Sequence, residues 1–271
     1  MNTGLLKSLK ENKSTDKMPT LFIGHGSPMN AIEDNQYRQS WVELGQKLPT
    51  PSAILSISAH WITQGVTKVT AMELPKTIHD FGGFPNELYQ QQYPAKGSPE
   101  LAQETIKLVS APSIQPDVDW GLDHGTWSVL SPMYPNAQIP VYQISIDYSK
   151  PPQFHYDLAL QLRALRNKGV LILGSGNIVH NLGAINYTKK PYDWALEFDS
   201  TIKKNIDERK HQEIINFQKL GSVAKQAHPS YDHFLPLLYI LALQEECEEV
   251  SYFNDSFDLG SISMRSLIIS K

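Results

Sequence analysis

The sequence has almost no cysteine, no long apolar stretch and no excess of positive charge. Cys247 is the one cysteine among 271 residues, so no internal disulfide can form, as is typical of proteins from a reducing compartment. No apolar run approaches the roughly 18 residues that a membrane span requires. The 24 basic and 28 acidic residues give a net charge of −4, which leaves no basic excess to neutralise a phosphate backbone. The sequence therefore predicts neither a membrane span nor a nucleic-acid partner.

The composition is that of a folded chain. Hydrophobic residues make up 41% and charged residues 19%, which excludes an intrinsically disordered protein. Residues 1–18 contain one apolar pair, Leu5 and Leu6, which is too short for the apolar core of a secretion signal. We therefore expect a cytoplasmic protein with an N-terminal arm over 1–18. Because no repeat and no linker-like stretch follows, we expect a single catalytic domain over 19–271.

Short apolar runs alternate with helical patterns along this domain. The runs are typical of buried strands and cover 19–23, 53–59, 141–146 and 170–173, with edge strands expected at 249–253 and 262–269. Helical spacing or capping residues predict helices over 98–109, 154–165 and 194–206, and another that begins near 232. This alternation predicts an α/β fold, a three-layer α/β/α sandwich around a mostly parallel or mixed sheet.

Three of the nine histidines follow predicted strands. His25, His60 and His180 each come directly or shortly after an apolar run. Ligands of open α/β sheets bind beyond the carboxyl ends of the strands, so these side chains are expected to converge there. Neutral imidazoles bind Zn, Fe, Cu and Ni, and three protein ligands with open positions are typical of a catalytic metal site.

A further metal ligand is expected from the segment HPSYDH. His233 is favoured because it stands at a predicted helix start, where the helix dipole disfavours the charged imidazolium. His228, five residues earlier, is the alternative.

Two loops combine histidine, glycine and aromatic residues. The first contains His79, Phe81 and Phe84, and the second, which also contains His124, ends at Trp127. Each is equally well interpreted as a surface turn or as the wall of a pocket for a flat aromatic ligand.

Six motifs resemble, in order, those of the DODA-type extradiol aromatic ring-opening dioxygenases: GHGSPMN, SAHW, HDFGGFP, DHGTW, GSGNIVHNL and HPSYDHFLPLL. The resemblance extends from about residue 18 to the end of the chain. It implies an α/β fold with one mononuclear divalent metal per chain. It also implies a reaction in which O₂ opens a small catechol next to its hydroxyl groups, with a DOPA-like catechol cut at the 4,5 position to a muconate semialdehyde.

Residue by residue, the resemblance assigns His25 and His60 as the first two metal ligands and His233 as the third. Some relatives have glutamate at the third position, so this chain departs from the two-histidine, one-carboxylate triad. Fe(II) is expected for turnover. Zn(II) is the alternative in the isolated protein, since such ligands bind zinc more tightly than ferrous iron.

The resemblance also assigns proton transfer. His180 matches the acid/base histidine, although it could instead be a fourth neighbour of the metal, and His124 matches a second pocket histidine. Two alternatives to a dioxygenase remain at this level: a zinc-dependent hydrolase on a similar scaffold, and a non-catalytic binding protein of the same fold. The sequence leaves the oligomeric state open.

Overall fold

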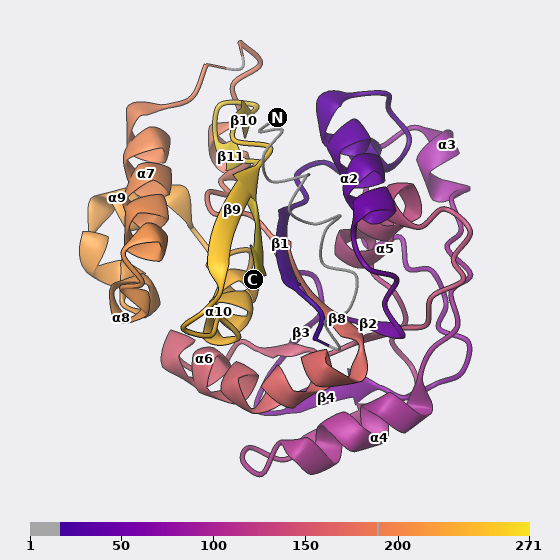
Figure 1. Cartoon of the computed structure of the whole chain (residues 1–271). Helices are drawn as coiled ribbons and strands as arrows, with labels where there is room; N and C mark the ends of the chain where they lie inside the picture. The colour runs from indigo at the N-terminus through magenta and orange to yellow at the C-terminus, as the bar shows by residue number, and fades with distance from the viewer. Residues whose placement is uncertain (1–16, 189) are drawn as a thin grey trace.

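The computed structural model describes residues 17–188 and 190–271, so 1–16 of the predicted arm lie outside the described residues. A six-stranded sheet lies at the centre, between two layers of helices (Figure 1). In spatial order its strands are β6 (Val141–Gln143), β2 (Ala53–Ser58), β8 (Val170–Gly176), β1 (Thr20–Gly24), β12 (Ser266–Ser270) and β9 (Glu249–Phe253).

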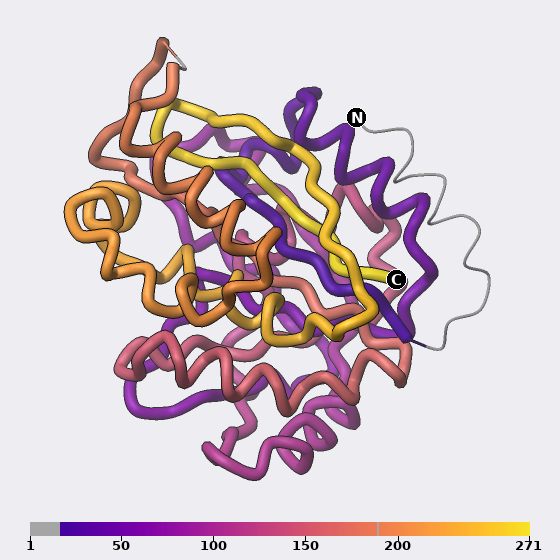
Figure 2. Tube along the Cα trace, turned by 60° about the vertical axis from the view of Figure 1, so that its left-hand side comes forward, coloured from indigo at the N-terminus to yellow at the C-terminus, as the bar shows by residue number. Residues whose placement is uncertain are grey.

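The four strands from β6 to β1 are parallel, whereas β12 and β9 run antiparallel to their neighbours. The predicted sheet is thus confirmed as a mixed one. Figure 2 shows the first strand, in indigo, beside the yellow C-terminal strands. The register pairs Gly24 with Gly176 and Ser58 with Ser175, so β1, β8 and β2 end at the same level. The loops that follow these three strands therefore meet at one edge of the sheet.

Side chains alternate between the two faces of the sheet because successive residues of a strand point in opposite directions. In β8, Val170 and Ile172 belong to one hydrophobic core, and Leu171 and Leu173 belong to the other. The first core includes side chains of α4 (Pro99–Leu108), α6 (Pro152–Gln161), α7 (Asp193–Asp207) and α10 (Leu235–Ala242). The second includes side chains of α2 (Gln36–Lys47) and α5 (His124–Met133). The expected three layers are present.

Most predicted helices are found close to their expected limits. The helix expected over 98–109 is α4, and the one expected over 194–206 is α7. The stripe that begins at Phe154 spans two elements, because α6 continues as a 3₁₀ helix, η2 (Leu162–Lys168). Gly169 ends this segment with φ of 78°, the left-handed conformation that favours glycine after a helix.

Three boundaries differ from the expectation. The run 141–146 is interrupted after Gln143, and its last residue begins β7 (Ile146–Asp147), which pairs with β3 (Ile62–Thr63) outside the main sheet. The helix expected near 232 begins at Leu235, because the His233 carbonyl accepts a hydrogen bond from Asn177 N (2.9 Å) instead of one within the helix. Of the two C-terminal segments expected at an edge, β12 is internal and β9 forms the edge.

Smaller elements complete the described chain. They are the strands β4 (Thr67–Thr70), β5 (Ile114–Asp117), β10 (Phe257–Asp258) and β11 (Ile262–Ser263), the helices α3 (Asn86–Tyr89), α8 (His211–Ile215) and α9 (Ser222–Ala227), and the 3₁₀ helices η1 (Pro28–Ala31), η3 (Leu182–Ala184) and η4 (Phe217–Leu220). Among the described residues, no helix combines the length and the apolar character needed to cross a membrane.

Candidate metal centre and active site

Five histidines gather at the carboxyl edge of the sheet. His25, His60 and His180 follow β1, β2 and β8, as the sequence predicted from the strand ends. His124 is the first residue of α5, and His233 lies two residues before α10. Ring contacts link all five: His60 with His25, His124 and His233, and His180 with His233. Residues that are far apart in the chain thus form one cluster.

The spacing of three rings suits a shared ion. The ring centroids of His25, His60 and His233 are 5.1, 5.2 and 4.9 Å apart in the three pairs. A metal–nitrogen bond of about 2.1 Å puts a ring centroid about 3.2 Å from the ion, so ligand rings at about 90–110° have centroids about 4.5–5.3 Å apart. The observed separations fall within this range.

His124 lies beside this trio. One nitrogen from each of His25, His60 and His124 lies within 4.8 Å of the others, so among the described residues the donor atoms themselves group these three histidines, and His233 is not in that group. However, the His124 centroid is 3.8 Å from that of His60 and 5.9 Å from that of His25. By the spacing used above, the first distance is short and the second is long for rings bound to one ion.

His180 and His228 occupy different surroundings. The His180 ring stacks on His233 with a centroid distance of 3.5 Å and an interplanar angle of 4°. The His228 Nε2 is 2.7 Å from the Ile178 carbonyl oxygen, and its ring packs against phenylalanine side chains such as Phe234. His228 therefore supports the loop that leads to His180, while His233 faces the other histidines.

Hydrogen bonds set the proton position on His25. Its Nδ1 lies 2.9 Å from the Ser175 hydroxyl, which itself donates to the Gly125 carbonyl at 2.5 Å. Because the serine proton is directed at Gly125, the hydroxyl accepts from His25 Nδ1–H. The lone pair of the His25 ring is then on Nε2, 3.2 Å from Nε2 of His60.

Carboxylates lie beside three other rings. Asp232 Oδ2 accepts a hydrogen bond from Nδ1 of His233 at 2.8 Å, so Nδ1 of His233 carries the proton and its Nε2 carries the lone pair. Asp80 Oδ2 lies at ion-pair distance from Nδ1 of His124 (3.0 Å) and of His60 (3.4 Å), and its negative charge favours a proton on each of these nitrogens.

This donor set fits a metal ion. Nε2 of His25 and Nε2 of His60 are 3.2 Å apart, a hydrogen-bond distance if one of them carries a proton; when neither does, a cation that accepts both lone pairs removes their repulsion. Histidine ligands of metals almost always donate their other N–H to an oxygen, as these rings do. The cluster can therefore hold one divalent cation.

Burial keeps the rings neutral. It lowers the pKa of His25 and His233 well below the ordinary value, the neighbouring histidines adding to the effect. Burial likewise lowers the pKa of His60 to about 3 and of His180 to about 4. The neutral His233 expected from a helix dipole is thus explained mainly by loss of solvent. Neutral imidazole is the form that binds metals.

Asp80 is ionised under the same conditions. Burial alone would raise the pKa of its carboxyl group, but the hydrogen bond from His124 and the nearby imidazoles lower it overall. Asp80 and the histidines are thus in complementary forms, an acceptor beside N–H donors.

Two glycines permit this close packing. A Cβ atom on Gly125 would lie 2.4 Å from Ser58 Oγ and 2.8 Å from the His60 ring. A Cβ atom on Gly176 would lie 2.2 Å from the His233 carbonyl oxygen. Any larger residue at either position would displace a histidine of the cluster.

The aromatic loop lies beside the cluster. The Phe81 ring contacts the edge of His124 with centroids 5.5 Å apart, and Phe84 packs behind Phe81 at 5.3 Å. His79 points away, with Nε2 2.9 Å from the Gln91 carbonyl oxygen. Trp127 is fully buried and donates its Nε1–H to the Ile78 carbonyl oxygen. Of these four predicted substrate contacts, Phe81 lies next to the histidines, and the other three support its position.

Sequence reasoning missed the polar side chains behind the histidines. Asp123 caps α5 and is fully buried, and it accepts hydrogen bonds from Ser58 Oγ (2.6 Å) and Gln143 Nε2 (2.7 Å). The Ser58 hydroxyl in turn accepts from His60 N (3.2 Å). Asp80 and Asp232 were within the quoted motifs, next to His79 and His233. Their position beside histidines was a signal that could have found them.

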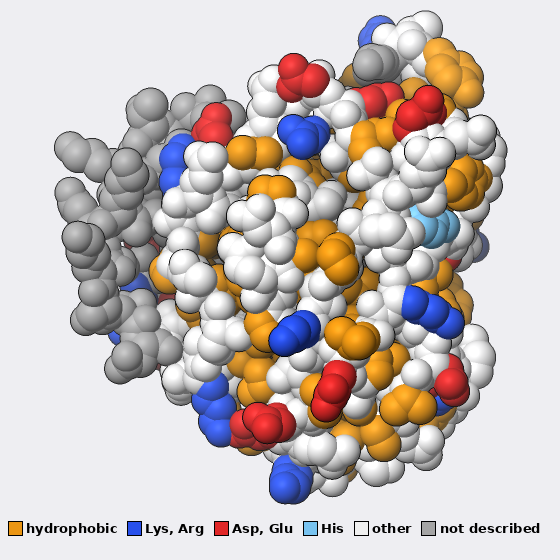
Figure 3. All heavy atoms as spheres, turned by 90° about the vertical axis from the view of Figure 1, so that its right-hand side faces the viewer, with side chains coloured by type: hydrophobic (Ala, Val, Ile, Leu, Met, Phe, Trp, Pro, Cys, Tyr) orange, Lys and Arg blue, Asp and Glu red, His pale blue; other side chains and the backbone are white. Residues whose placement is uncertain are grey.

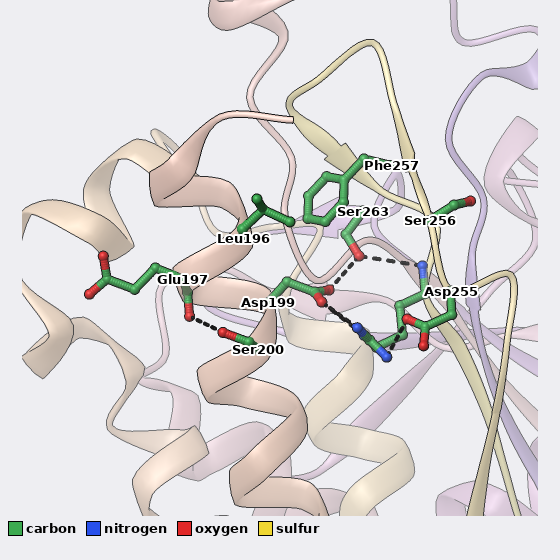
Figure 4. Close-up of a pocket in the computed structure, with 9 residues that line it drawn as sticks. Leu196, Glu197, Asp199, Ser200, Asp255, Ser256, Phe257 and Ser263 are labelled. Carbon is green, nitrogen blue, oxygen red and sulfur yellow. Dashed lines mark hydrogen bonds and ion pairs between the residues drawn. The ribbon is translucent and has the colours of Figure 1, made fainter. Parts of the chain in front are cut away.

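A cavity of about 340 Å³ lies away from the histidines, between α7 and the C-terminal strands (Figure 4). The buried Arg265 binds Asp199 there through Nε (2.9 Å) and Nη2 (2.6 Å), and it also pairs with Asp255. The guanidinium charge is therefore already balanced by carboxylates. None of the five clustered histidines lines this cavity.

One face of the surface is drawn in Figure 3. Its basic and acidic side chains are interspersed, with hydrophobic side chains between them. This face shows no concentration of basic side chains.

Comparison with known proteins identifies the family of this chain. A family model described as the catalytic LigB subunit of aromatic ring-opening dioxygenase matches residues 19–261. The chain is 45% identical to a 4,5-DOPA dioxygenase extradiol of Escherichia coli over 94% of this chain and 96% of that protein. It is 37% identical to a protein of the same name from Beta vulgaris, over 91% and 94%.

A solved structure is similar as well. The crystal structure of an uncharacterized protein from Escherichia coli K12 matches with a TM-score of 0.82 and 40% identity, covering 94% of this chain and 100% of that one. The chain therefore belongs to the LigB family of aromatic ring-opening dioxygenases, which are metal-dependent. The DODA-type resemblance read from the six motifs is confirmed.

Proposed function

We propose that this protein is an extradiol dioxygenase that uses O₂ to open a small DOPA-like catechol at the 4,5 position, giving a muconate semialdehyde. Both oxygen atoms enter the product, and the ring bond next to a hydroxyl-bearing carbon breaks. The names of the relatives support the substrate class. The observation that carries the proposal is the mutual spacing of His25, His60 and His233, with their Nε2 lone pairs free of protons.

In this proposal His25, His60 and His233 hold one divalent metal, Fe(II) for turnover, with Zn(II) able to occupy the same ligands in the isolated protein. The metal supplies Lewis acidity, which lowers the pKa of the catechol hydroxyls, and it brings the two substrates together. His228 is disfavoured as a ligand because its ring packs among the side chains of Phe198, Phe217 and Phe234.

In this proposal His124 and His180 transfer protons. Because Asp80 holds the proton of His124 on Nδ1, the free Nε2 of His124 can accept a hydroxyl proton from the catechol. We assign the main acid/base role to His180 because it matches the acid/base histidine of the related dioxygenases; burial lowers the pKa of its ring to about 4, so the ring is neutral near neutral pH. The parallel stack on His233 fixes the orientation of the ring and leaves it adjacent to the metal ligands.

Phe81 forms the aromatic wall of the substrate site. Its ring is half-buried and contacts both His124 and Tyr89, at centroid distances of 5.5 and 5.1 Å. A catechol ring placed next to the histidines would meet this surface. Stacking or edge contacts between aromatic rings contribute about 0.5–1.5 kcal/mol beyond the area buried.

The test is a reconstitution. The metal-free protein is loaded with Fe²⁺ without oxygen, mixed with DOPA or unsubstituted catechol, and then exposed to air, while O₂ uptake and visible absorbance are recorded. We expect one O₂ consumed per catechol and a yellow semialdehyde, with nuclear magnetic resonance of the DOPA product locating the broken bond. Protein loaded with Zn²⁺ is the control and should be inactive.

Absence of O₂ uptake by the ferrous protein with every catechol would overturn the proposal. Hydrolytic activity of the zinc-loaded protein would then support the hydrolase alternative, and catechol binding without turnover would support a non-catalytic binding protein. We further propose that residues 19–271 act as one catalytic domain in the cytoplasm, which fractionation of the source cells and limited proteolysis would check.

A further inference from the structure

We propose that Asp80 is a positioning residue that fixes the proton on Nδ1 of both His60 and His124, so that both Nε2 lone pairs face the metal and substrate site. One carboxylate would thereby prepare a metal ligand and a proton-transfer group together. The inference deepens the proposed function and rests on it for the roles of the two rings. Its geometry and its test do not depend on oxygenase activity.

The two oxygens of Asp80 have separate partners. Oδ1 accepts the backbone N–H of His124 at 2.8 Å, at the start of α5. Oδ2 faces Nδ1 of His124 at 3.0 Å and Nδ1 of His60 at 3.4 Å. The backbone group can only donate, so it determines which way the side chain is turned. Oδ2 is thereby left within ion-pair distance of both ring nitrogens.

Asp80 differs in this respect from the other acceptors of the cluster. Ser175 serves His25, and Asp232 serves His233, so each of these acceptors orients one ring. Asp80 serves two rings whose centroids are 3.8 Å apart. One carboxylate can therefore act on both rings at once.

Asp80 is adjacent in the chain to Phe81, the aromatic wall of the proposed substrate site. It directly precedes Phe81, whose ring contacts the ring of His124 with centroids 5.5 Å apart. His124 is therefore in contact with the side chains of two adjacent residues, a carboxylate and an aromatic ring. Asp80 itself is anchored to α5 through the His124 N–H.

The substitution Asp80→Asn distinguishes this role from simple packing. The amide oxygen must remain on the His124 N–H, so the amide NH₂ takes the place of Oδ2 and points at the two Nδ1 atoms. Each ring is then favoured to carry its proton on Nε2, which removes the lone pair from the metal site. Asp80→Ala removes the acceptor without adding a donor, so its rings should populate both tautomers.

The experiment uses metal-free protein labelled with nitrogen-15 in histidine. Long-range proton–nitrogen spectra report the tautomer of each ring, with His60→Gln and His124→Gln assigning the signals. Zn²⁺ affinity is measured by competition with a chromophoric chelator. Asp157→Asn is the matched control, because Asp157 is an exposed carboxylate on α6 that accepts from Gln153.

We expect Nδ1–H tautomers on both rings in the wild-type protein and Nε2–H tautomers in Asp80→Asn. The zinc affinity of Asp80→Asn should fall about 10–100-fold, the usual cost of losing an outer partner of a ligand. Asp80→Ala should lose less affinity, although asparagine is the closer match in shape. Asp157→Asn should match the wild type in both measurements.

Unchanged Nδ1–H tautomers in Asp80→Asn would overturn the proposal, and so would equal losses of zinc affinity in both variants, which would indicate packing alone. If Asp80→Asn does not fold, Asp80→Ala provides the test. Pure Nδ1–H tautomers of His60 and His124 in Asp80→Ala would overturn the proposal. A wild-type protein that shows the expected tautomers but no O₂ uptake would contradict the dioxygenase function and leave the role of Asp80 intact.

Discussion

The amino and carboxyl edges of the central sheet differ in how their buried polar groups are paired. At the amino edge of β1 and β8, the buried Arg166 donates to the Met18 and Leu243 carbonyl oxygens and forms two hydrogen bonds to Glu248, at 2.9 and 2.5 Å. At the carboxyl edge, the Nε2 atoms of His25 and His60 face each other at 3.2 Å, so at most one of them can donate. The first set is paired within the chain, whereas the second presents converging nitrogen donors that a cation can bind. Converging imidazole donors therefore mark the functional edge.

The largest expected effect comes from removing a ligand at the carboxyl edge. His25→Ala or His60→Ala should abolish binding of the metal and lower kcat/KM by more than about 100-fold, the upper range for losing an outer-shell partner alone. Elemental analysis of the purified variants, together with O₂ uptake, measures both. Full metal occupancy in either variant would contradict the ligand assignment.

His180→Ala should separate metal binding from proton transfer. General acid–base groups contribute about 10²–10⁴-fold to rate, so kcat should fall by that range while metal occupancy stays near that of the wild type. Stopped-flow kinetics with the ferrous protein gives kcat, and elemental analysis gives the occupancy. Loss of the metal in this variant would instead make His180 a fourth ligand.

Glu248→Gln tests the buried ion pair between Arg166 and Glu248 at the amino edge of the sheet. Breaking a buried ion pair costs about 3–5 kcal/mol, so the free energy of unfolding measured in urea should fall by that amount. Metal affinity should not change, since the other edge is untouched. Glu43→Gln, which removes a partly exposed pair with Lys47, is the control and should cost at most about 1 kcal/mol.

The same ion pair predicts a dependence of stability on pH. Burial by itself would raise the pKa of Glu248, but Arg166 and the other donors lower it overall. A lowered pKa in the folded state means that the stabilisation is present above the ordinary glutamate pKa and is lost as pH falls through the folded value. The urea midpoint of the wild type should therefore fall more steeply in acid than that of Glu248→Gln. Parallel curves would contradict this assignment.

The smallest expected effect concerns the substrate wall. Phe81→Leu should raise KM for a catechol several-fold, corresponding to about 0.5–1.5 kcal/mol, and leave kcat nearly unchanged. Steady-state O₂ uptake separates the two constants. Phe257→Leu, which alters the cavity between α7 and the C-terminal strands instead, is the matched control and should leave KM and kcat unchanged. An unaltered KM in Phe81→Leu would remove this residue from the substrate site.

The sequence predicted the parts of the site that local patterns encode. His25, His60 and His180 could be placed because each follows a short apolar run, and parallel strands end at a common edge. The interruption after Gln143 had no local signal, since it depends on pairing of β7 with β3. Such long-range pairings are decided by tertiary packing, which overrides local preference.

Asp80 shows why part of the site escaped prediction. It is 20 positions after His60 and 44 before His124 in the chain, and no spacing rule for strands or helices connects these three residues. Their meeting depends on where the loop after β4 lies against α5. His233 was favoured over His228 as a helix start, yet the helix begins at Leu235.

The pairing of β1 with β12 has a consequence for how the protein is made. Thr20 lies opposite Ile269, and the strand that leads to His25 is flanked on one side by this late segment of the chain. During synthesis on the ribosome, β1 can pair with β12 only after the residues up to Ser270 have been synthesised. Contacts between such distant positions slow folding, so the metal pocket should be among the last parts of the newborn polypeptide to mature.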